Sequence, residues 1–199
     1  MAPPGSSTRS LTRDDWLETA TTAMTRGGVR AVAVEPLAKT LGATKGSFYW
    51  HFRDRDDLVR RALERWEQQE TESVIEGLES VIDTRERLRL LLSEIHGRLS
   101  GRPDTSVALS GDTDHAVCAA LERVTARRIG FVAEQLAALG VPADEAGRRA
   151  LLAYTGYLGF ATLARSAPGA LPAADAVNAY VETVLAALVP KTPPHRDDG

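Results

Sequence analysis

Residues 34–55 read VEPLAKTLGATKGSFYWHFRDR, and this stretch decides the fold that we expect for the chain. Apolar residues at helical spacing predict a first helix over residues 34–41. Pro36 falls in its first turn, where a missing N–H costs little, and Gly42 can end it. A second short helix is expected over residues 44–49, with a threonine as its cap. Two helices joined by a tight turn that contains glycine predict a helix-turn-helix.

The second helix of this pair opens with residues suited to the major groove of DNA. Its first turn is small, polar or cationic and has no carboxylate, and such a helix contacts bases with its first turn. Gly46 lets the backbone approach closely, while Lys45 and Ser47 can hydrogen-bond to base edges. The hydroxyl, imidazole and guanidinium groups that follow commonly hold phosphates. The candidate DNA-binding residues are Thr44, Lys45, Gly46, Ser47, Tyr49, Trp50, His51 and Arg55.

The segment resembles the tetracycline-repressor (TetR) family of bacterial transcription regulators. The resemblance is carried by Leu37-Ala38, Leu41-Gly42, the run Thr44-Lys45-Gly46-Ser47-Phe48-Tyr49-Trp50-His51-Phe52, and then Asp54, Asp57 and Leu58. It covers about residues 12–66, and the order of the later helices agrees with the family. The resemblance implies that Tyr49 and His51 clamp backbone phosphates, that the first residues of the second helix touch bases, and that Arg55 makes another backbone contact.

One position departs from the pattern of the family. The family usually caps the first helix of the pair with Ser or Thr, which also touches phosphate, whereas this chain has Ala33 there. Loss of such a cap costs roughly 1 kcal/mol. Glu35, close by, is unfavourable beside DNA. The sequence therefore leaves open whether the helix over residues 34–41 contacts DNA.

The rest of the chain also has helical spacing, so an all-α fold of about nine helices is expected. Thr12 and Asp15 have the spacing of a capping box for a helix over residues 12–26. Asp54 and Asp57 cap the fourth helix, which can continue to about residue 81. Residues 100–114 read as a loop with one short helical turn at 107–109. The remaining helices are expected at 84–99, 113–139, 143–166 and 173–189.

These elements predict two domains and two tails. An amino-terminal three-helix domain carries the helix-turn-helix, and a helical carboxy-terminal domain binds a ligand and dimerises. The expected bounds are 1–11 for a flexible arm, 12–54 for the DNA-binding domain, 55–189 for the effector and dimerisation domain, and 190–199 for a disordered tail.

The last two predicted helices favour a homodimer. In residues 143–166, apolar and aromatic residues recur at the spacing of a helix-bundle seam, and residues 173–189 carry a second apolar stripe. Two copies of this pair would make a four-helix bundle. Gly156 and Gly159 would allow helices to approach closely. The candidate interface residues are Leu151, Leu158, Val177, Val181, Val184 and Leu188.

The resemblance also implies a small effector bound inside the carboxy-terminal region. Aromatic and polar residues there can line a mostly apolar cavity with a few hydrogen-bonding groups. We expect a lipophilic small molecule to enter and to move the fourth helix, which joins the cavity to the DNA-binding head. The candidate effector-binding residues are His96, Phe131, Tyr154 and Tyr157.

Composition excludes several other classes of protein. The 199 residues are 43% hydrophobic and 26% charged, which is ordinary for a globular protein. The net charge of −3 divides into +3 for residues 1–66 and −6 for residues 67–199, so the basic part is the one expected to meet nucleic acid. Cys118 is the only cysteine, which rules out an intrachain disulfide and a cysteine-based zinc cluster. Neither a metal nor a cofactor is expected.

The sequence also lacks signals for secretion, membranes and catalysis. No signal peptide is recognisable, and no apolar run approaches the roughly 18 residues of a membrane span. We therefore expect a cytoplasmic protein with no membrane partner. The familiar motifs for a nucleophile with its base, a phosphate-binding loop or a metalloprotease are missing, so no enzyme is expected.

The leading hypothesis is a dimeric transcriptional repressor that binds a near-palindromic stretch of double-stranded DNA and leaves it when a small effector binds. Two alternatives stay open: a transcriptional activator, and a helical DNA-binding or interaction protein that responds to no effector. The identity of the effector, the operator and the target genes cannot be read from the residues.

Overall fold

A computed structural model describes residues 11–99 and 104–189, and all regular secondary structure in these two ranges is helical. The expected all-α class is confirmed. The predicted amino-terminal arm and carboxy-terminal tail lie almost wholly outside the described residues. The helices are α1 (Arg13–Gly27), α2 (Val34–Leu41), α3 (Lys45–Phe48), α4 (Arg55–Glu67), α5 (Ser73–Glu79), α6 (Thr84–Leu99), α7 (Thr105–Leu109), α8 (His115–Ala138), α9 (Ala143–Ser166) and α10 (Val177–Leu188). Shorter turns are η1 (Val29–Ala31), η2 (Gln68–Glu72), η3 (Pro168–Ala170) and η4 (Ala174–Ala176).

We call the amino-terminal part of the molecule, which contains α1, α2 and α3, the head. The ends of its helices follow local sequence signals. Thr12 Oγ1 accepts a hydrogen bond from Asp15 N, and the Asp15 carboxylate accepts one from Thr12 N, which completes the predicted capping box. α2 ends at Gly42, whose φ of 63° lies in the left-handed region that favours glycine. At its start, Ala33 provides no side-chain cap. These ends are decided by neighbouring residues, and they lie where the sequence predicted them.

α3 is shorter than expected. Its α-helical part covers only Lys45–Phe48, and the chain continues through hydrogen-bonded turns. The amide of His51 bonds to the carbonyl of Phe48 at 2.9 Å, and the amide of Trp50 bonds to that of Ser47 at 3.3 Å. These i to i+3 bonds wind the backbone more tightly than an α-helix does. The segment still forms one continuous turn structure that presents residues 44–51 together.

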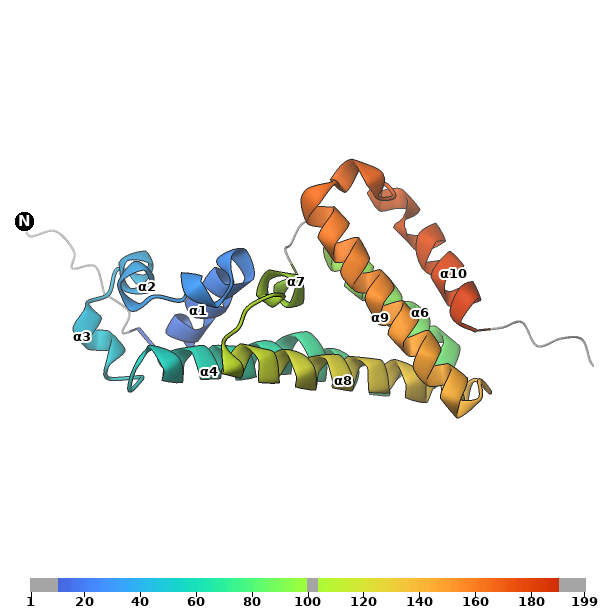
Figure 1. Ribbon diagram of the computed structural model, residues 1–199, viewed down its shortest axis with the longest axis horizontal. Coiled ribbons are helices and arrows are strands. Elements are labelled where there is room, and N and C mark those ends of the chain that lie inside the picture. The colour runs from blue at the N-terminus through green and yellow to red at the C-terminus, as the bar shows by residue number, and fades with distance from the viewer. Residues whose placement is uncertain (1–10, 100–103, 190–199) are drawn as a thin grey trace, which may run out of the picture.

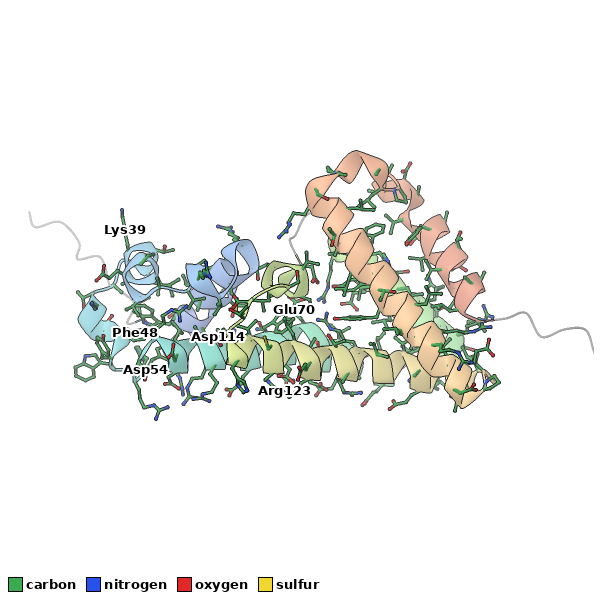
Figure 2. All side chains as sticks on the ribbon, viewed as in Figure 1. Lys39, Phe48, Asp54, Glu70, Asp114 and Arg123 are labelled. Atoms are coloured by element: carbon green, nitrogen blue, oxygen red, sulfur yellow. The ribbon has the colours of Figure 1, made fainter. Side chains whose placement is uncertain are left out.

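An aromatic cluster fixes α3 in the head. The rings of Trp16 and Phe48 meet edge to face at 5.4 Å, and Phe52 stacks on Phe48 at the same centroid distance. All three side chains are buried, and Figure 2 shows Phe48 lying toward the other helices of the head while Lys39 points away from it. Such ring pairs are worth about 0.5–1.5 kcal/mol beyond their buried area.

α4 continues into α5 through a π-helical turn, η2, where the sequence predicted one unbroken helix. Asp54 caps α4 by accepting from the amide of Asp57 at 2.7 Å. A π-turn inserts one extra residue into a helix, and such turns are frequent at functional sites. Apolar periodicity does not reveal this interruption because the helix runs on beyond it.

The molecule is elongated, with the head at one end (Figure 1). At the other end lies a helical body, which we define as α5, α6, α8, α9 and α10. α4 and α8 lie side by side along its length, and α9 crosses above the far part of α8 with α6 and α10 beside it (Figure 1). One core cluster contains side chains from α1, α2, α3, α4, α7 and α8. A second contains side chains from α6, α8, α9 and α10. The first cluster therefore crosses residue 55, the predicted start of the second domain.

The predicted dimer stripe on α10 faces the chain's own core instead. Val177, Val181 and Leu188 are buried among α6, α8 and α9 of the same chain. Val184 and Leu158 are half-buried, and Leu151 is exposed. A short amphipathic helix has one apolar stripe, and in α10 this stripe is already buried against α6, α8 and α9 of the same chain.

Candidate DNA-binding surface and ligand cavity

The outer edge of the head is formed by α3 and the turns that follow it. Phe48 anchors this segment inward, while Tyr49 is 58% exposed and Trp50 is 87% exposed. Lys45 and Gly46 are exposed as well. One buried ring thus holds a row of exposed polar, cationic and aromatic groups on a single edge. Such an edge can follow a nucleic-acid backbone and reach its bases.

Two of the predicted residues serve the local fold. Thr44 Oγ1 accepts from the amide of Ser47 at 3.2 Å, and the Ser47 hydroxyl donates to the carbonyl of Thr44 at 2.9 Å. Gly46 is different, because a Cβ built there would meet nothing nearer than Thr44 Oγ1 at 3.7 Å. The fold itself would tolerate a side chain at Gly46. Its absence leaves the surface of α3 open to close approach.

Lys45 has a partner that sequence reasoning missed. Its ammonium lies 3.2 Å from a carboxylate oxygen of Glu35, in the first turn of α2. Both side chains are largely exposed, so the ion pair itself adds at most ~1 kcal/mol to stability. A carboxylate therefore stands beside the cation expected to contact bases. Helical periodicity did not reveal this contact, because the two residues are ten positions apart and lie on different helices.

Arg55 is built into the head. Its Nε donates to the carbonyl of Val32 at 2.7 Å, and its Nη2 donates to that of Val29 at 2.8 Å. These bonds tie the start of α4 to the turn between α1 and α2. The residue lies where the resemblance placed it, but much of its hydrogen-bonding capacity is directed inward. His51 is half-buried, with its ring 6.4 Å from that of Phe52.

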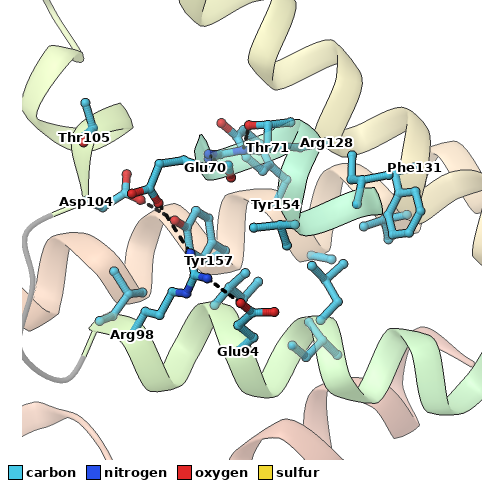
Figure 3. A pocket seen from close by; sticks show the side chains of 18 of the residues that line it. Glu70, Thr71, Glu94, Arg98, Asp104, Thr105, Arg128, Phe131, Tyr154 and Tyr157 are labelled. Carbon is cyan, nitrogen blue, oxygen red and sulfur yellow. Dashed lines mark hydrogen bonds and ion pairs between the residues drawn. The ribbon is translucent and has the colours of Figure 1, made fainter. Parts of the chain in front are cut away.

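A cavity of about 100 Å³ lies in the body, between α5, α6, α8, α9 and the π-turn η2 (Figure 3). Most of its wall is aliphatic or aromatic. One end is polar, with Thr71, Asp104 and Arg128 among its groups. A mostly apolar wall with a few convergent polar groups is the usual form of a small-molecule site.

Three of the four predicted effector residues line this cavity: Phe131, Tyr154 and Tyr157. His96 does not. Its ring is 2% exposed and packs against those of Tyr157, Phe160 and Tyr180. Its Nδ1 lies 2.7 Å from the carbonyl of Leu92. Burial lowers the pKa of His96, which favours the neutral ring.

The polar end of the cavity holds a network that sequence reasoning missed. The Tyr157 hydroxyl donates to the Asp104 carboxylate, and burial together with that negative charge raises the pKa of Tyr157. Arg98 reaches between Glu94 and Glu70 (Figure 3). The sequence contained one signal for this polar group. Arg128 lies on the same face of α8 as the buried residues Val124 and Phe131, so helical spacing could have placed a cation on the inner side of the helix.

The amino-terminal part of the chain matches the family model described as "Bacterial regulatory proteins, tetR family" over residues 17–62. The chain therefore carries the amino-terminal region that is typical of the TetR family. The transcriptional regulator AcrR of Shigella flexneri is 32% identical over 106 residues, which are 42% of this chain and 47% of that protein. The chain thus matches about half the length of this curated relative.

Two solved structures of transcriptional regulators share the fold over nearly the whole chain. A cysteine mutant of the TetR-family regulator CifR, complexed with 26-base-pair operator DNA, is 22% identical with a TM-score of 0.73, covering 90% of this chain and 98% of that one. The regulator FadR from Bacillus subtilis, in complex with stearoyl-CoA, is 14% identical with a TM-score of 0.68, covering 92% and 100%. At these identities the likeness shows the fold.

Two further kinds of feature, metal-binding clusters and membrane-spanning helices, are not found among the described residues. In residues 11–99 and 104–189, no group of three or more His, Cys, Asp or Glu side chains is placed to hold a metal ion. Over the same described ranges, no helix combines the length and apolarity that crossing a membrane requires. The exposed edge of the head and the cavity of the body are therefore the two sites that we interpret.

Proposed function

We propose that this chain is a homodimeric, DNA-binding transcriptional repressor of the TetR family that leaves its operator when a small lipophilic molecule enters the cavity. The observation that carries the proposal is the outer edge of the head. Phe48 is buried there, while Lys45, Tyr49 and Trp50 are exposed side by side on one segment. That arrangement suits insertion of α3 into the major groove, with Tyr49 and His51 on the flanking phosphates.

The dimer forms through the outer face of α9 and α10. Leu152, Gly156, Gly159 and Leu163 recur at helical spacing on α9, and all four are exposed. A Cβ built at either glycine would meet nothing within 4 Å, so one copy of the chain does not require small residues there. A second copy of α9 and α10 packing closely on this face accounts for them. The two pairs then form a four-helix bundle.

The relatives support each half of the proposal. CifR was solved with operator DNA, and FadR was solved with stearoyl-CoA. In this chain the cavity touches η2, and η2 joins the body to the head through α4. A ligand that alters η2 can therefore change the separation of the two recognition segments in a dimer.

Selection from a random pool of double-stranded DNA tests the proposal directly. The expected product is a near-palindrome whose half-sites are about 34–36 Å apart, or a multiple of one helical turn. If repeated selection enriches no sequence, the assignment as a specific regulator is wrong. A promoter that carries the selected site, transcribed in vitro with and without the protein, then separates a repressor from an activator.

A DNA-binding protein that answers to no effector is the alternative at the level of regulation. The cavity and its junction with η2 favour the effector-controlled form. We assign no enzymatic activity to the chain, and a cytoplasmic location accords with binding to DNA in a bacterium.

A further inference from the structure

Arg128 is one of two arginines in the cavity wall. It projects from α8, and its guanidinium donates to Thr71 Oγ1 at 3.0 Å, to the carbonyl of Glu70 at 3.1 Å and to Ser106 Oγ at 3.1 Å. It also lies over the ring of Trp66, 5.9 Å from the centroid. One side chain thus bridges α8, α7, the π-turn η2 and the end of α4.

The charge of Arg128 has no carboxylate partner among the described residues. All three of its oxygen partners are neutral. The other cation of the wall, Arg98, is paired with Glu94 and lies 3.8 Å from a carboxylate oxygen of Glu70.

The remaining carboxylate of the wall, Asp104, is also occupied. It accepts from the Tyr157 hydroxyl and from the amide of Val107. Each acidic group at this end of the cavity therefore already has a hydrogen-bond donor, and no carboxylate of the described residues lies within ion-pair distance of the Arg128 guanidinium.

From this arrangement we propose that the effector is a small lipophilic carboxylic acid, whose carboxylate binds Arg128 and whose apolar body fills the rest of the cavity. The inference rests on the proposed function, because it names the effector class of that regulator. The apolar wall includes Val74, Ile75, Leu91, Ile95, Phe131 and Val132. A cavity of about 150 Å³ is enough to bind benzene, so a space of about 100 Å³ suits a short alkyl chain or, with small side-chain shifts, one aromatic ring.

A carboxylate can compete for Arg128 because it brings an opposite charge and can accept two parallel N–H bonds from one guanidinium, whereas each of the present acceptors is neutral and takes a single bond. Its arrival redirects the guanidinium away from the Glu70 carbonyl and the Thr71 hydroxyl, both of which belong to η2. The π-turn then loses the bonds that hold its extra residue. Return of η2 toward regular helix rotates α4, and hence the head, relative to α5.

Calorimetric titration of the full-length protein with matched ligands tests the ligand class. The panel is butanoate, hexanoate, octanoate, benzoate and phenylacetate, each with its primary amide and its amine of equal length. At least one acid is expected to bind ten times more tightly than its own amide, and to change the emission of Trp66. A panel in which no acid binds, or in which the amides or amines bind as tightly as the acids, overturns the proposal. Tighter binding of the amines would indicate a lipophilic cation drawn by the acidic groups.

Variants of α8 test whether the preference for an acid comes from Arg128 itself or from the overall positive charge of the helix. Arg128→Met should lose the preference for acid over amide, and Arg128→Lys should keep part of it. Arg127→Met is the matched control, because Arg127 lies next to Arg128 but pairs with Glu72 and does not line the cavity. The comparison of ligands on the wild-type protein stands even if Arg128→Met fails to fold. Equal preference for the acid in folded Arg128→Met and the wild type would overturn the assignment.

The DNA arm of the experiment distinguishes the two proposals. Binding of the acid is expected to weaken affinity for the selected DNA, and by linkage the DNA must weaken binding of the acid by the same factor. An acid that binds through Arg128 but leaves DNA affinity unchanged overturns its role as the effector. Failure of DNA selection, by contrast, would overturn the proposed function whatever the ligands do.

Discussion

At the scale of the residue, the proposed function divides the exposed edge of the head into groups that position DNA and groups that read its bases. Tyr49 lies exposed on the ring of Phe48, at a centroid distance of 5.2 Å, so Tyr49→Phe removes the hydroxyl while the packing stays. We expect this variant to weaken binding to all DNA sequences alike, because phosphate contacts carry no base information. Lys45→Ala should instead relax preference at one or two base positions, by roughly 1–3 kcal/mol. Titrations on the selected site and on single-base variants of it measure both effects, and unchanged affinity in both proteins would refute the placement of α3.

Glu35 gives a second prediction at this scale. Its carboxylate holds the ammonium of Lys45 and also adds a negative charge to the face that approaches phosphates. Glu35→Gln should therefore strengthen binding to random-sequence DNA and shift the base preference of Lys45. Glu18→Gln is a suitable control, since Glu18 is an exposed acid on α1. If both variants raise affinity equally without changing base preference, Glu35 acts only through net charge.

At the scale of the element, α4 depends on a buried carboxylate in its first turn. Asp57 is 4% exposed and accepts from Arg60 at 2.6 Å, from Arg61 at 2.9 Å and from the amide of Arg53 at 3.3 Å. Burial alone would raise the pKa of Asp57, but the hydrogen bonds from Arg53 and Arg61 and their charges outweigh it and hold that pKa below its usual value. α4 is thereby tied at its start by a charged network.

The sign of the pH dependence follows from this lowered pKa. The stability that Asp57 contributes is complete above the pKa of an unfolded aspartate, about 3.9, and is lost as the pH falls through the lower folded value. Asp57→Asn should cost about 1–3 kcal/mol of unfolding free energy at neutral pH and less in strong acid. Urea unfolding at a series of pH values measures the difference. A difference that stays constant down to the most acidic pH would contradict the account.

At the scale of the whole molecule, the proposed dimer forms on the exposed face of α9. Leu152 is 64% exposed there, and Leu152→Glu should give monomers, because a dimer would bury an unpaired charge. Ile82 is 95% exposed between α5 and α6 and belongs to neither α9 nor α10, so Ile82→Glu should leave the dimer intact. Light scattering distinguishes the two. A wild-type protein that is monomeric at micromolar concentration would refute the proposed dimer.

Val181→Glu should behave differently from Leu152→Glu. Val181 is 1% exposed in the core that joins α10 to α6 and α9, so a charge there should unfold the body rather than only separate two copies. A melting curve recorded by circular dichroism checks this. If the variant melts like the wild type but is a monomer, the apolar stripe of α10 belongs to the dimer interface, as the sequence analysis predicted.

Much of the fold followed from the sequence because its signals are local. The capping box at Thr12, the glycine at the end of α2 and the bounds of α6 and α9 depend on residues within one or two turns of each other. The candidate DNA-binding edge was equally accessible, since its residues are consecutive. Helical periodicity and a short ordered motif are enough for both.

The tertiary structure alone decided what depends on residues far apart in the chain. Spacing alone does not show whether an apolar stripe faces its own core or a partner, so the sequence did not reveal that Val177, Val181 and Leu188 of α10 are buried within one chain. On α9 the sequence pointed to Gly156 and Gly159 but not to the exposed Leu152 and Leu163 beside them. The pairing of Lys45 with Glu35, the inward bonds of Arg55 and the burial of His96 likewise depend on neighbours from other elements. The sequence by itself determined the all-helical class, many of the helix ends and the consecutive motif of the head, but neither the short extent of α3 nor the π-turn between α4 and α5. The packing of those helices determined the cavity and the surroundings of Arg128, because a cavity is bounded by side chains that only the assembled helices bring together.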